Sequence, residues 1–566
     1  MTAFDWFLVI GINLAIVLYG VFFVKGKGGS FDWFLASQSL PWWAIGLSAF
    51  GTAVDIGDYT AVAGGSYRFG LAQLAQWWLG ISIGWFLVSF FVILPAYRSG
   101  VFTNAEWLEF RFGPATRVLA VVINTLSRAN VTGNMYFSMF LVLNIVAGVT
   151  DLLAWVIVVG VAALTVAYIV TGGLRSDVIT DSIQSVFMVL ASLILFVVVW
   201  NAVGGWSGAT QKLAAIDPAL PGQLLHVGGY SPGGVPPIVV VISFIITLTM
   251  YVTINQYEWI RFLGSRSEWD MRMGAVVASV ITAICVFFNL VMGPFGKIDF
   301  PDLTVVDQVY PLLMNKYLGP GLIGLVVAGM MAAAFSTFDS IGVGISSLWV
   351  RDIYARFINR TADDAHYTLV GKLLVPVILM LGFVFAPFLG GGMLAFYLRL
   401  AGAIQVPLMT TILMGALTNV RREAGIWGLL AGLAYGLVSI FGEGQLPTLI
   451  TSTWWAFIWN IIIPASVMLV VSKVMDAQRG PAPEDELLGL VYSRSGQVEQ
   501  GMQSVIHRRL SAIGGTWLEK TLDEFRTRPR YPFPVGKEGL PLYKRPEVLA
   551  IAYLLVFGFL TLVVFW

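Results

Sequence analysis

"SLPWWAIGLSAFGTAVDIGDYTAVAGGSYRFGL", residues 39–71, decides the fold, because it is an apolar stretch of spanning length that is interrupted near its middle. Glycines and carboxylates interrupt it at Gly51, Asp55, Gly57, Asp58, Gly64 and Gly65. These residues favour an unwound membrane helix, in which freed carbonyls can coordinate a cation and half-helix ends can face a polar solute. The alternative is that one aspartate, Asp58 in particular, only caps the second half-helix.

The chain is too apolar for a water-soluble protein. Of its 566 residues, 57% are hydrophobic and 11% are charged, and its mean hydropathy is +0.81. A formal net charge of +1 offers no electrostatic footprint for nucleic acid. Cys285 is the only cysteine and the three histidines are scattered, which excludes internal disulfides and argues against a Cys- or His-based metal centre. The sequence therefore predicts a membrane protein.

Apolar runs of spanning length predict about fourteen transmembrane helices. The runs fall at about 4–24, 40–69, 71–98, 118–148, 151–171, 175–203, 234–263, 268–296, 319–353, 366–389, 392–417, 424–442, 451–474 and 546–566. If the N-terminus is outside, alternating connections place most Lys and Arg residues on the inner side, as the positive-inside rule requires. We expect a multi-pass protein of the cell membrane with both termini outside.

Residues 476–545, between the last two spans, are polar and Pro-rich. The connection pattern predicts that this insert is cytosolic, with short amphipathic helices around 497–511 and 515–526. It has no catalytic constellation, which favours a passive cap over the cytosolic face. A regulatory or partner-binding role is the alternative.

"MAAAFSTFDSIGVGISSLWVRDIY", residues 331–354, carries hydroxyls in a spanning helix. Its small and hydroxylated residues follow one another by three or four and share one face: Ala333, Ser336, Thr337, Ser340, Gly344 and Ser347. Such a stripe can serve close helix packing alone. Asp339 argues for more, because an ionisable group at membrane depth usually faces a cavity, an ion or a partner.

A second intramembrane carboxylate occurs in "GGLRSDVITDSIQSVFMVLASLILFVVV", residues 172–199, at Asp181. Thr180 and Gln184 lie beside it in the sequence. Hydroxyls and carboxylates are hard oxygen ligands of the kind that bind an alkali cation. An acid on one helix and a hydroxyl stripe with an acid on another together indicate a cation site.

Several motifs, in order over roughly residues 30–440, resemble those of the sodium:solute symporter family, which includes the sodium–glucose and sialic acid transporters. The motifs are "FLASQSLPWW" at 34–43, "GGSYRFGL" at 64–71, "RSGVFTNAEWLEFRFG" at 98–113, "GGLRSDVITDSIQ" at 172–184, and "AAAFSTFDS" at 332–340 followed by "RDIY". The resemblance implies an all-α integral membrane protein with a leucine-transporter-type five-plus-five inverted repeat.

This fold divides the chain into six parts. They are an extra N-terminal transmembrane helix and cytosolic loop at 1–39, a first five-helix repeat at 40–203, an inverted second repeat at 234–417, two additional transmembrane helices at 424–475, the cytosolic insert at 476–545, and a last transmembrane helix at 546–566.

The resemblance also implies a common sodium site. It consists of backbone carbonyls of Gly51, Val54 and Ala333 and the hydroxyls of Ser336 and Thr337. Sodium is thus the expected coupling ion.

Family members with a second sodium use an aspartate at the position of Asp181, with hydroxyls at positions matching Ser336, Asp339 and Ser340. This chain differs from those members, since it has a carboxylate at Asp339. Two carboxylates in a low-dielectric site call for a cation between them, so either a second sodium or a proton is expected there.

For the solute, the resemblance points to Asp58, Trp77 and Asn130, the last being the position at which sialic acid transporters carry an arginine. Neighbouring residues could supply hydrogen bonds and an aromatic face for a hydroxylated solute. The full candidate set is Asp55, Asp58, Gln76, Trp77, Asn130, Tyr251, Asn255, Gln256 and Tyr257. Arg128 should point away from the arginine position, being about 200° away on the helix.

We therefore expect a sodium-coupled symporter that imports a small polar organic solute by alternating access, with a sugar or polyol favoured. The alternatives are an amino acid or small carboxylate symporter, and a sodium-gated sensor that signals through 476–545. An enzyme is not expected, since no base–nucleophile pair can be assembled. The expected partners are the solute, sodium and the lipid bilayer, not nucleic acid; the oligomeric state stays open, and a monomer is compatible with the sequence.

Overall fold

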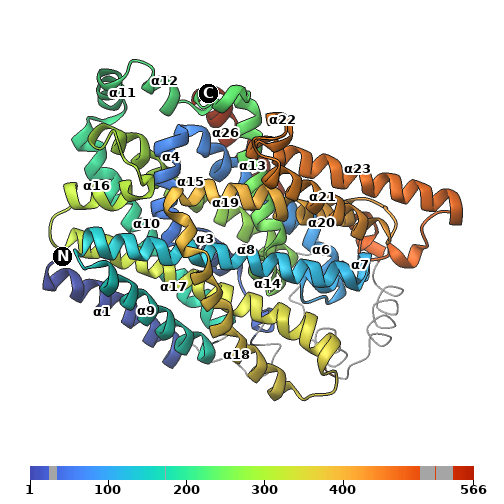
Figure 1. Cartoon of the computed structure of the whole chain (residues 1–566). Helices are drawn as coiled ribbons and strands as arrows, with labels where there is room; N and C mark the ends of the chain where they lie inside the picture. The colour runs from blue at the N-terminus through green and yellow to red at the C-terminus, as the bar shows by residue number, and fades with distance from the viewer. Residues whose placement is uncertain (24–32, 34, 173, 498–516, 518–539) are drawn as a thin grey trace.

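Most of the expected spans are single helices in the computed structural model, which describes residues 1–23, 33, 35–172, 174–497, 517 and 540–566 (Figure 1). Among these residues, twelve helices are long and apolar enough to cross a membrane. A broken helix at 42–69 and the shorter apolar helix at Asp151–Ala167 correspond to the two further expected spans.

The first broken helix consists of α3 (Trp42–Ala53) and α4 (Ile56–Phe69), which are separated by extended backbone at Val54 and Asp55. The Asp55 carboxylate accepts hydrogen bonds from the backbone N–H groups of Gly57 (2.5 Å) and Asp58 (3.2 Å). In return, the Asp58 carboxylate accepts one from the backbone N–H of Asp55 (2.9 Å). This capping box satisfies donors at the start of α4, so the break is built into the sequence.

A second helix is also broken, but without a side-chain cap. It consists of α13 (Pro237–Ile254) and α14 (Gln256–Leu263), with extended backbone at Asn255 between them. The two broken helices meet: the N–H of Leu40 donates to the carbonyl of Gly264, and the N–H of Arg266 donates to the carbonyl of Leu40, both at 3.1 Å. The start of α3 is thereby joined to the end of α14.

The first group of helices begins with the first broken helix. After α3 and α4 it comprises α5 (Ile81–Leu87), α6 (Ile93–Ser99), α7 (Asn104–Phe112), α8 (Pro114–Leu141), α9 (Asp151–Gly172) and α10 (Leu174–Val203). The 3-10 turn η2 (Gly70–Gln73) and the π-helical turn η3 (Ala75–Gly80) lead into α5. Two shorter helices, α11 (Gly205–Ile216) and α12 (Leu220–Leu224), connect this group to the next.

The second group of helices begins with the second broken helix. It comprises α13, α14, α15 (Glu268–Asp299), α16 (Val309–Tyr317), α17 (Leu322–Leu348), α18 (Asp364–Met380), α19 (Met393–Leu400) and α20 (Val406–Leu417). The helices outside the two groups are α1 (Ala3–Phe23), α21 (Ala424–Phe441), α22 (Thr448–Thr451), α23 (Thr453–Arg479) and α26 (Pro546–Phe559). The arrangement agrees with the expected five-plus-five organisation, although the exact repeat boundaries stay a prediction.

Buried ion pairs gather at one end of the bundle. At the end that includes α7, called the α7 end, buried ion pairs join α7, α8 and the residues after α17; they are Arg117 with Glu109 and Asp352, Arg351 with Glu106, and Arg356 with Glu109. Burial alone would raise the pKa of Glu109, but Arg117 and Arg356 lower it overall.

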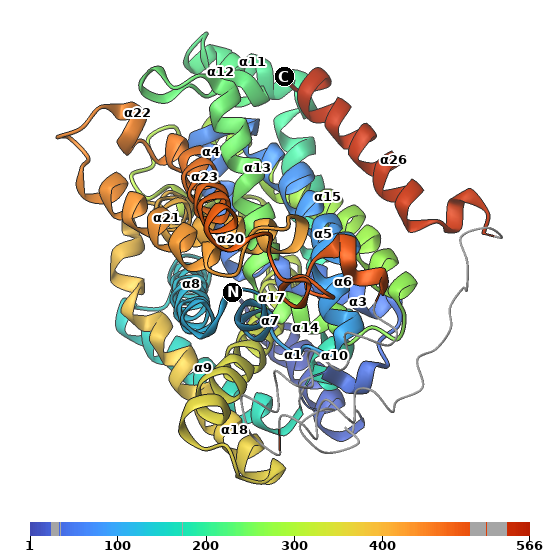
Figure 2. The same ribbon diagram turned by 90° about the vertical axis from the view of Figure 1, so that its right-hand side faces the viewer.

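Both termini lie on the side of the bundle away from α7, called the α12 end (Figure 1). Figure 2 shows the bundle from the α7 side, with α11, α12 and the C-terminus at its top. The Val227 N–H, just after α12, donates to the carbonyl of Phe565 (2.6 Å). The Asp5 carboxylate, in α1, accepts from the N–H of Gly321 (2.7 Å), just before α17.

The described parts of the insert contact the α7 end. The Trp107 indole donates to the carbonyl of Leu490 (3.3 Å), and Arg98 donates to Ser495 (3.1 Å). Trp517 donates to Asp364 (2.7 Å). The expected amphipathic helices around 497–511 and 515–526 fall almost wholly outside the described residues.

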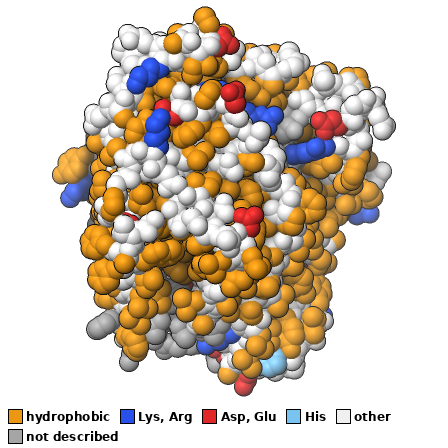
Figure 3. Space-filling model, turned by 60° about the vertical axis from the view of Figure 1, so that its left-hand side comes forward, with side chains coloured by type: hydrophobic (Ala, Val, Ile, Leu, Met, Phe, Trp, Pro, Cys, Tyr) orange, Lys and Arg blue, Asp and Glu red, His pale blue; other side chains and the backbone are white. Residues whose placement is uncertain are grey.

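The surface is consistent with a bilayer environment. In Figure 3 hydrophobic side chains cover much of the face shown, and Lys, Arg, Asp and Glu side chains lie mainly toward its upper part. Residues such as Phe7, Leu152 and Phe441 are 70%, 77% and 75% exposed. Large apolar side chains with that exposure suit contact with lipid rather than water.

Candidate ion and solute sites

The hydroxyls of α17 lie against the C-terminal end of α3, where the first broken helix unwinds. The Ser336 hydroxyl donates to the carbonyl of Gly51 at 2.9 Å, and the Thr337 hydroxyl approaches the carbonyl of Thr52 at 3.3 Å. Both side chains are fully buried. The structure thus brings hydroxyls and backbone carbonyls together at one point, an oxygen-rich arrangement of the kind that suits an alkali cation.

Gly51 is required for this close approach. A Cβ at this position would lie 2.8 Å from the Ser185 hydroxyl oxygen and 3.3 Å from that of Ser336. A larger residue would therefore displace these two hydroxyls from their present positions. Val54 and Ala333, the other two expected carbonyl ligands, are also fully buried, and their part in a sodium site stays a prediction.

Asp181 of α10 lies beside this hydroxyl group, and its charge is met by Arg261 of α14. One Asp181 oxygen accepts from Ser336 (2.5 Å). The other accepts from Ser48 (2.5 Å) and from Arg261 (3.0 Å). All four side chains are fully buried.

Arg261 also binds the other groups around Asp181. Its guanidinium lies 3.2 Å from the Asp177 carboxylate and donates to the Ser340 hydroxyl. Its Nε donates to Ser48 at 2.6 Å. One fixed cation therefore serves two carboxylates and two hydroxyls at the position expected for a second sodium.

This arrangement changes what the expected second cation site requires. The sequence predicts a sodium or a proton between Asp181 and Asp339. It does not reveal that Arg261 and Asp177 belong to the same cluster. Asp339 is buried on α17 (3% exposed), whereas the Asp181 carboxylate bonds to hydroxyls and to Arg261. A cation shared by Asp181, Asp339 and Ser340 stays a prediction, and it would have to compete with the guanidinium. Among the described residues, no group of three or more His, Cys, Asp or Glu could hold a metal ion.

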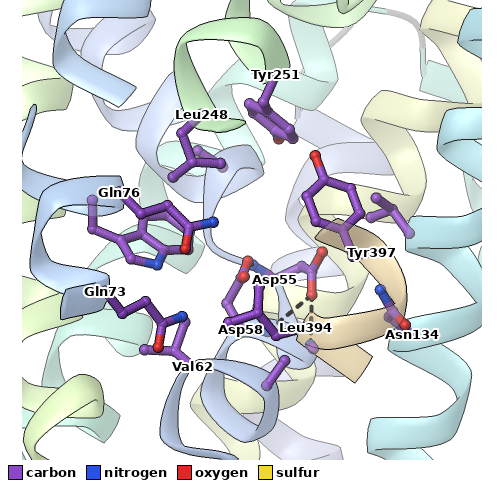
Figure 4. A pocket seen from close by; sticks show the side chains of 15 residues that line it. Asp55, Asp58, Val62, Gln73, Gln76, Asn134, Leu248, Tyr251, Leu394 and Tyr397 are labelled. Atoms are coloured by element: carbon purple, nitrogen blue, oxygen red, sulfur yellow. Dashed lines mark hydrogen bonds between the residues drawn. The ribbon is translucent and has the colours of Figure 1, made fainter. Parts of the chain in front are cut away.

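A small cavity of about 60 Å³ lies at the break in the first broken helix. It is lined by Ala53, Asp55, Gly57, Asp58, Ala61, Val62, Gln73, Gln76, Trp77, Val131, Asn134, Leu248, Tyr251, Leu394 and Tyr397. These residues come from the broken helix, the turns η2 and η3, and helices α8, α13 and α19 (Figure 4). The mixed polarity of this lining fits a small polar molecule.

Five of the nine residues expected to contact solute line this cavity. They are Asp55, Asp58, Gln76, Trp77 and Tyr251. Asp55, not Asp58, is the N-cap of α4, so the expected N-cap role of Asp58 is wrong; Asp58 is the third helical residue and completes the capping box. Asp58 also lines the cavity, and its contact with solute stays a prediction.

Tyr257 lies behind the lining, where it connects Tyr251 to a buried arginine. Its hydroxyl donates to that of Tyr251 (2.5 Å) and accepts from Arg128 (2.7 Å). The Arg128 guanidinium lies 5.0 Å from the centre of the Tyr251 ring. Arg128 does not line the cavity, but through Tyr257 it holds the lining residue Tyr251 in place.

The other expected solute residues do not line the cavity. Gln256 accepts from the N–H of Asn104 (3.0 Å) and donates to the carbonyl of Phe102 (3.2 Å), which fixes the start of α7. The Asn255 amide lies 3.5 Å from the Tyr257 hydroxyl. Asn130 is fully buried, one residue before the lining residue Val131, and its amide has no hydrogen-bond partner among the described residues. A direct solute contact for these residues stays a prediction.

The sequence analysis missed Gln73, Asn134 and Tyr397, which bring polar groups to the cavity. Helical spacing could have found two of them, because Gln73 precedes Gln76 by three residues and Asn134 follows Asn130 by four. Tyr397 gave no such signal, since none of the residues expected to contact solute lies near it in sequence.

Comparison with known proteins identifies the family of this chain. Residues 33–432 match the model of the sodium:solute symporter family. Solute carrier family 5 member 4 of Rattus norvegicus is 25% identical over 460 residues, which cover 72% of this chain and 66% of the rat protein. The sodium/glucose cotransporter of Vibrio parahaemolyticus is 26% identical over 475 residues, 78% of this chain and 86% of that protein.

A solved structure shares the fold. A substrate-bound, outward-open sodium-coupled sialic acid symporter superimposes with a TM-score of 0.71, at 19% identity, over 85% of this chain and 99% of its own. At that identity the likeness concerns the arrangement of helices alone.

Proposed function

We propose, starting from the fact that this chain belongs to the sodium:solute symporter family, that it imports a small polar solute together with sodium by alternating access. A sugar or polyol is the favoured class of solute, in line with the sodium/glucose cotransporters among its relatives. Sodium acts here as a co-transported ion, bound by the carbonyls of Gly51, Val54 and Ala333 and the hydroxyls of Ser336 and Thr337.

The observation that carries the proposal is that both sites share one unwound segment. The carbonyls of Gly51 and Thr52 accept hydrogen bonds from the α17 hydroxyls, whereas Ala53 and Asp55 line the cavity. An ion that reorganises the end of α3 therefore changes the wall of the cavity within two residues. This adjacency provides a physical basis for coupling ion binding to solute binding.

The composition of the cavity favours a hydroxylated solute over a carboxylate. Its fifteen lining residues include two aspartates and no lysine or arginine. Arg128, the nearest buried cation, is bonded to the Tyr257 and Ser127 hydroxyls behind the lining. A carboxylate solute would meet repulsion from Asp55 and Asp58, whereas amide groups at Gln73, Gln76 and Asn134 suit hydroxyls.

The charge distribution supports an orientation with the α7 end in the cytosol and both termini outside. Arg98, Arg117, Arg351, Arg356 and Arg421 all bond to groups at the α7 end. The positive-inside rule places such a concentration on the cytosolic side.

The direct test uses purified protein in proteoliposomes with an inward sodium gradient and a panel of radiolabelled sugars, polyols, amino acids and carboxylates. Uptake of one class that stops when potassium replaces sodium is the expected result. Uptake that is equally fast without sodium would contradict the proposal.

A further inference from the structure

The geometry points to a solute that carries a cationic nitrogen as well as hydroxyls, held by Asp55 and Asp58. An amino sugar or another hydroxylated amine has this chemistry. The inference rests on the proposed symport function and narrows the class of solute for the same cavity.

The capping box leaves one oxygen of each carboxylate available. Asp55 uses Oδ1 for the N–H groups of Gly57 and Asp58, and Asp58 uses Oδ2 for the N–H of Asp55. Among the described residues, no hydrogen bond reaches Asp55 Oδ2 or Asp58 Oδ1. Figure 4 shows both carboxylates directed into the space between Gln76 and Tyr397. The two acceptors therefore face the position that a solute would occupy.

No cationic side chain of the lining pairs with these carboxylates, and the nearby charge of Arg128 acts on Asp55 from behind the lining. The lining contains no Lys or Arg. The N-terminus of α4 contributes a partial positive charge of roughly half a unit. The Arg128 guanidinium lies over the Tyr251 ring, 5.0 Å from its centre. Tyr251 lines the cavity, whereas Arg128 does not. A cationic solute would supply the missing positive charge at the place where the two acceptors converge.

The proposed sodium site lies apart from these two carboxylates. The proposed sodium site uses carbonyls at the C-terminal end of α3 and hydroxyls of α17, whereas Asp55 and Asp58 belong to the start of α4. The break between α3 and α4 therefore separates the oxygens proposed to bind sodium from the carboxylates proposed to bind solute.

The remaining wall suits the rest of such a molecule. The side chains of Gln73, Gln76 and Trp77 are at most 3% exposed. Gln73 Oε1 and Nε2, Gln76 Oε1 and Trp77 Nε1 have no hydrogen-bond partner among the described residues. These buried donors and acceptors need hydroxyl partners. The rings of Trp77, Tyr251 and Tyr397 offer faces that attract a cation as well as an apolar sugar surface.

The experiment compares matched pairs that differ in one amine: glucosamine with glucose, 1-amino-1-deoxysorbitol with sorbitol, and ethanolamine with ethylene glycol. Thermal stabilisation of the purified full-length protein is titrated with each compound in sodium chloride and in potassium chloride. We expect at least one amine to stabilise the protein in sodium at a concentration about tenfold lower than its neutral partner. Binding of the neutral partners as tightly as the amines, or of no amine at all, would overturn the inference.

Asp58→Asn isolates the charge, because the asparagine carbonyl can still accept from the Asp55 N–H and keep the cap. The preference for the amine should fall by about tenfold in this variant. Asp302→Asn, which changes an exposed aspartate in the same way, should leave the preference unchanged. An unaltered preference in Asp58→Asn would remove Asp58 from the solute site.

The outcomes for the two proposals are distinguishable. Sodium-driven uptake of a neutral sugar with no amine preference leaves symport in place and refutes the cationic solute. Amine binding that is identical in sodium and potassium supports the cationic solute and refutes coupling to sodium.

Discussion

Arg261 and Asp181 form a fully buried ion pair, with a guanidinium nitrogen 3.0 Å from a carboxylate oxygen. The pair connects α14, the second half of one broken helix, to α10. Through Ser48 and Ser336 it also contacts α3 and α17. Four helices around the ion site are thus joined by one charged cluster.

The first prediction concerns the number of sodium ions. Because the Arg261 guanidinium already bonds to the Asp181 carboxylate, the sodium Hill coefficient of uptake should be near one in the wild type. Arg261→Gln removes the guanidinium and should raise the coefficient above one, as sodium takes its place. Asp181→Asn combined with Arg261→Gln should return it to one. Sodium-dependent uptake in proteoliposomes measures all three.

Loss of one partner of a buried pair costs about 3–5 kcal/mol of folding free energy, so thermal unfolding should accompany these assays. Arg266→Gln is a suitable control, since Arg266 forms a half-exposed pair with Asp270 nearby. A wild-type coefficient above one that falls in Asp339→Ala would instead support a second sodium shared by Asp181 and Asp339.

The second prediction concerns the proposed sodium site. Ser336→Ala and Thr337→Ala should each raise the sodium concentration required for half-maximal uptake by about tenfold or more, because a contact to a charged group is worth about 1.5–3 kcal/mol. Uptake measured against sodium concentration at fixed solute gives the value.

Ser346→Ala is the matched control for that experiment. Ser346 is fully buried on the same helix, but its hydroxyl donates to the carbonyl of Val343, three residues earlier. Unchanged sodium dependence in the Ser336→Ala, Thr337→Ala double variant would mean that the hydroxyl stripe is only a packing surface.

The third prediction separates the two roles of Asp55. Serine can also cap a helix, so Asp55→Ser should keep most of the stability and lose solute affinity. Asp55→Ala should lose solute affinity and in addition about 1 kcal/mol of stability from the missing cap. Thermal unfolding and solute binding, measured on both variants, distinguish the effects. Equal solute affinity in wild type and Asp55→Ser would show that the carboxylate only caps α4.

The fourth prediction concerns Asp307, which lies outside the candidate spans and packs against Gly64 of α4. Burial raises the pKa of Asp307 to about 7, although the Met393 N–H, which donates to its carboxylate at 2.9 Å, works in the opposite direction. Because the folded-state pKa lies above the ordinary value of 3.8, the neutral carboxyl stabilises the fold. This stabilisation is complete below about pH 4 and is lost as the pH rises through about 7.

Asp307→Asn should remove that pH dependence and be more stable than wild type at pH 8, because the amide cannot ionise and still accepts from Met393. Thermal unfolding between pH 5 and 8 tests this, with Asp302→Asn as an exposed control. A wild-type curve parallel to that of Asp307→Asn would exclude the effect.

The sequence by itself determined the first broken helix, whereas the break at Asn255 within the expected span 234–263 was not predicted. Glycines and aspartates at Gly51, Asp55, Gly57 and Asp58 predict an unwound segment, since they favour local backbone conformations and caps that act within a few residues. The hydroxyls at Ser336 and Thr337 share a face by helical periodicity alone. Such short-range effects can be read from a single chain.

Only the tertiary structure decided which charged residues form ion pairs. Arg261 is 80 residues from Asp181 in sequence and 79 from Ser340, and no local pattern reports that pairing. Asn130 and Tyr397 show the same limitation in the solute cavity, because Asn130 belongs to a cavity-lining helix without lining the cavity, whereas Tyr397 lines it from a distant segment. The physical reason is that burial and electrostatic pairing depend on how whole helices pack, whereas periodicity fixes only which residues of one helix share a face.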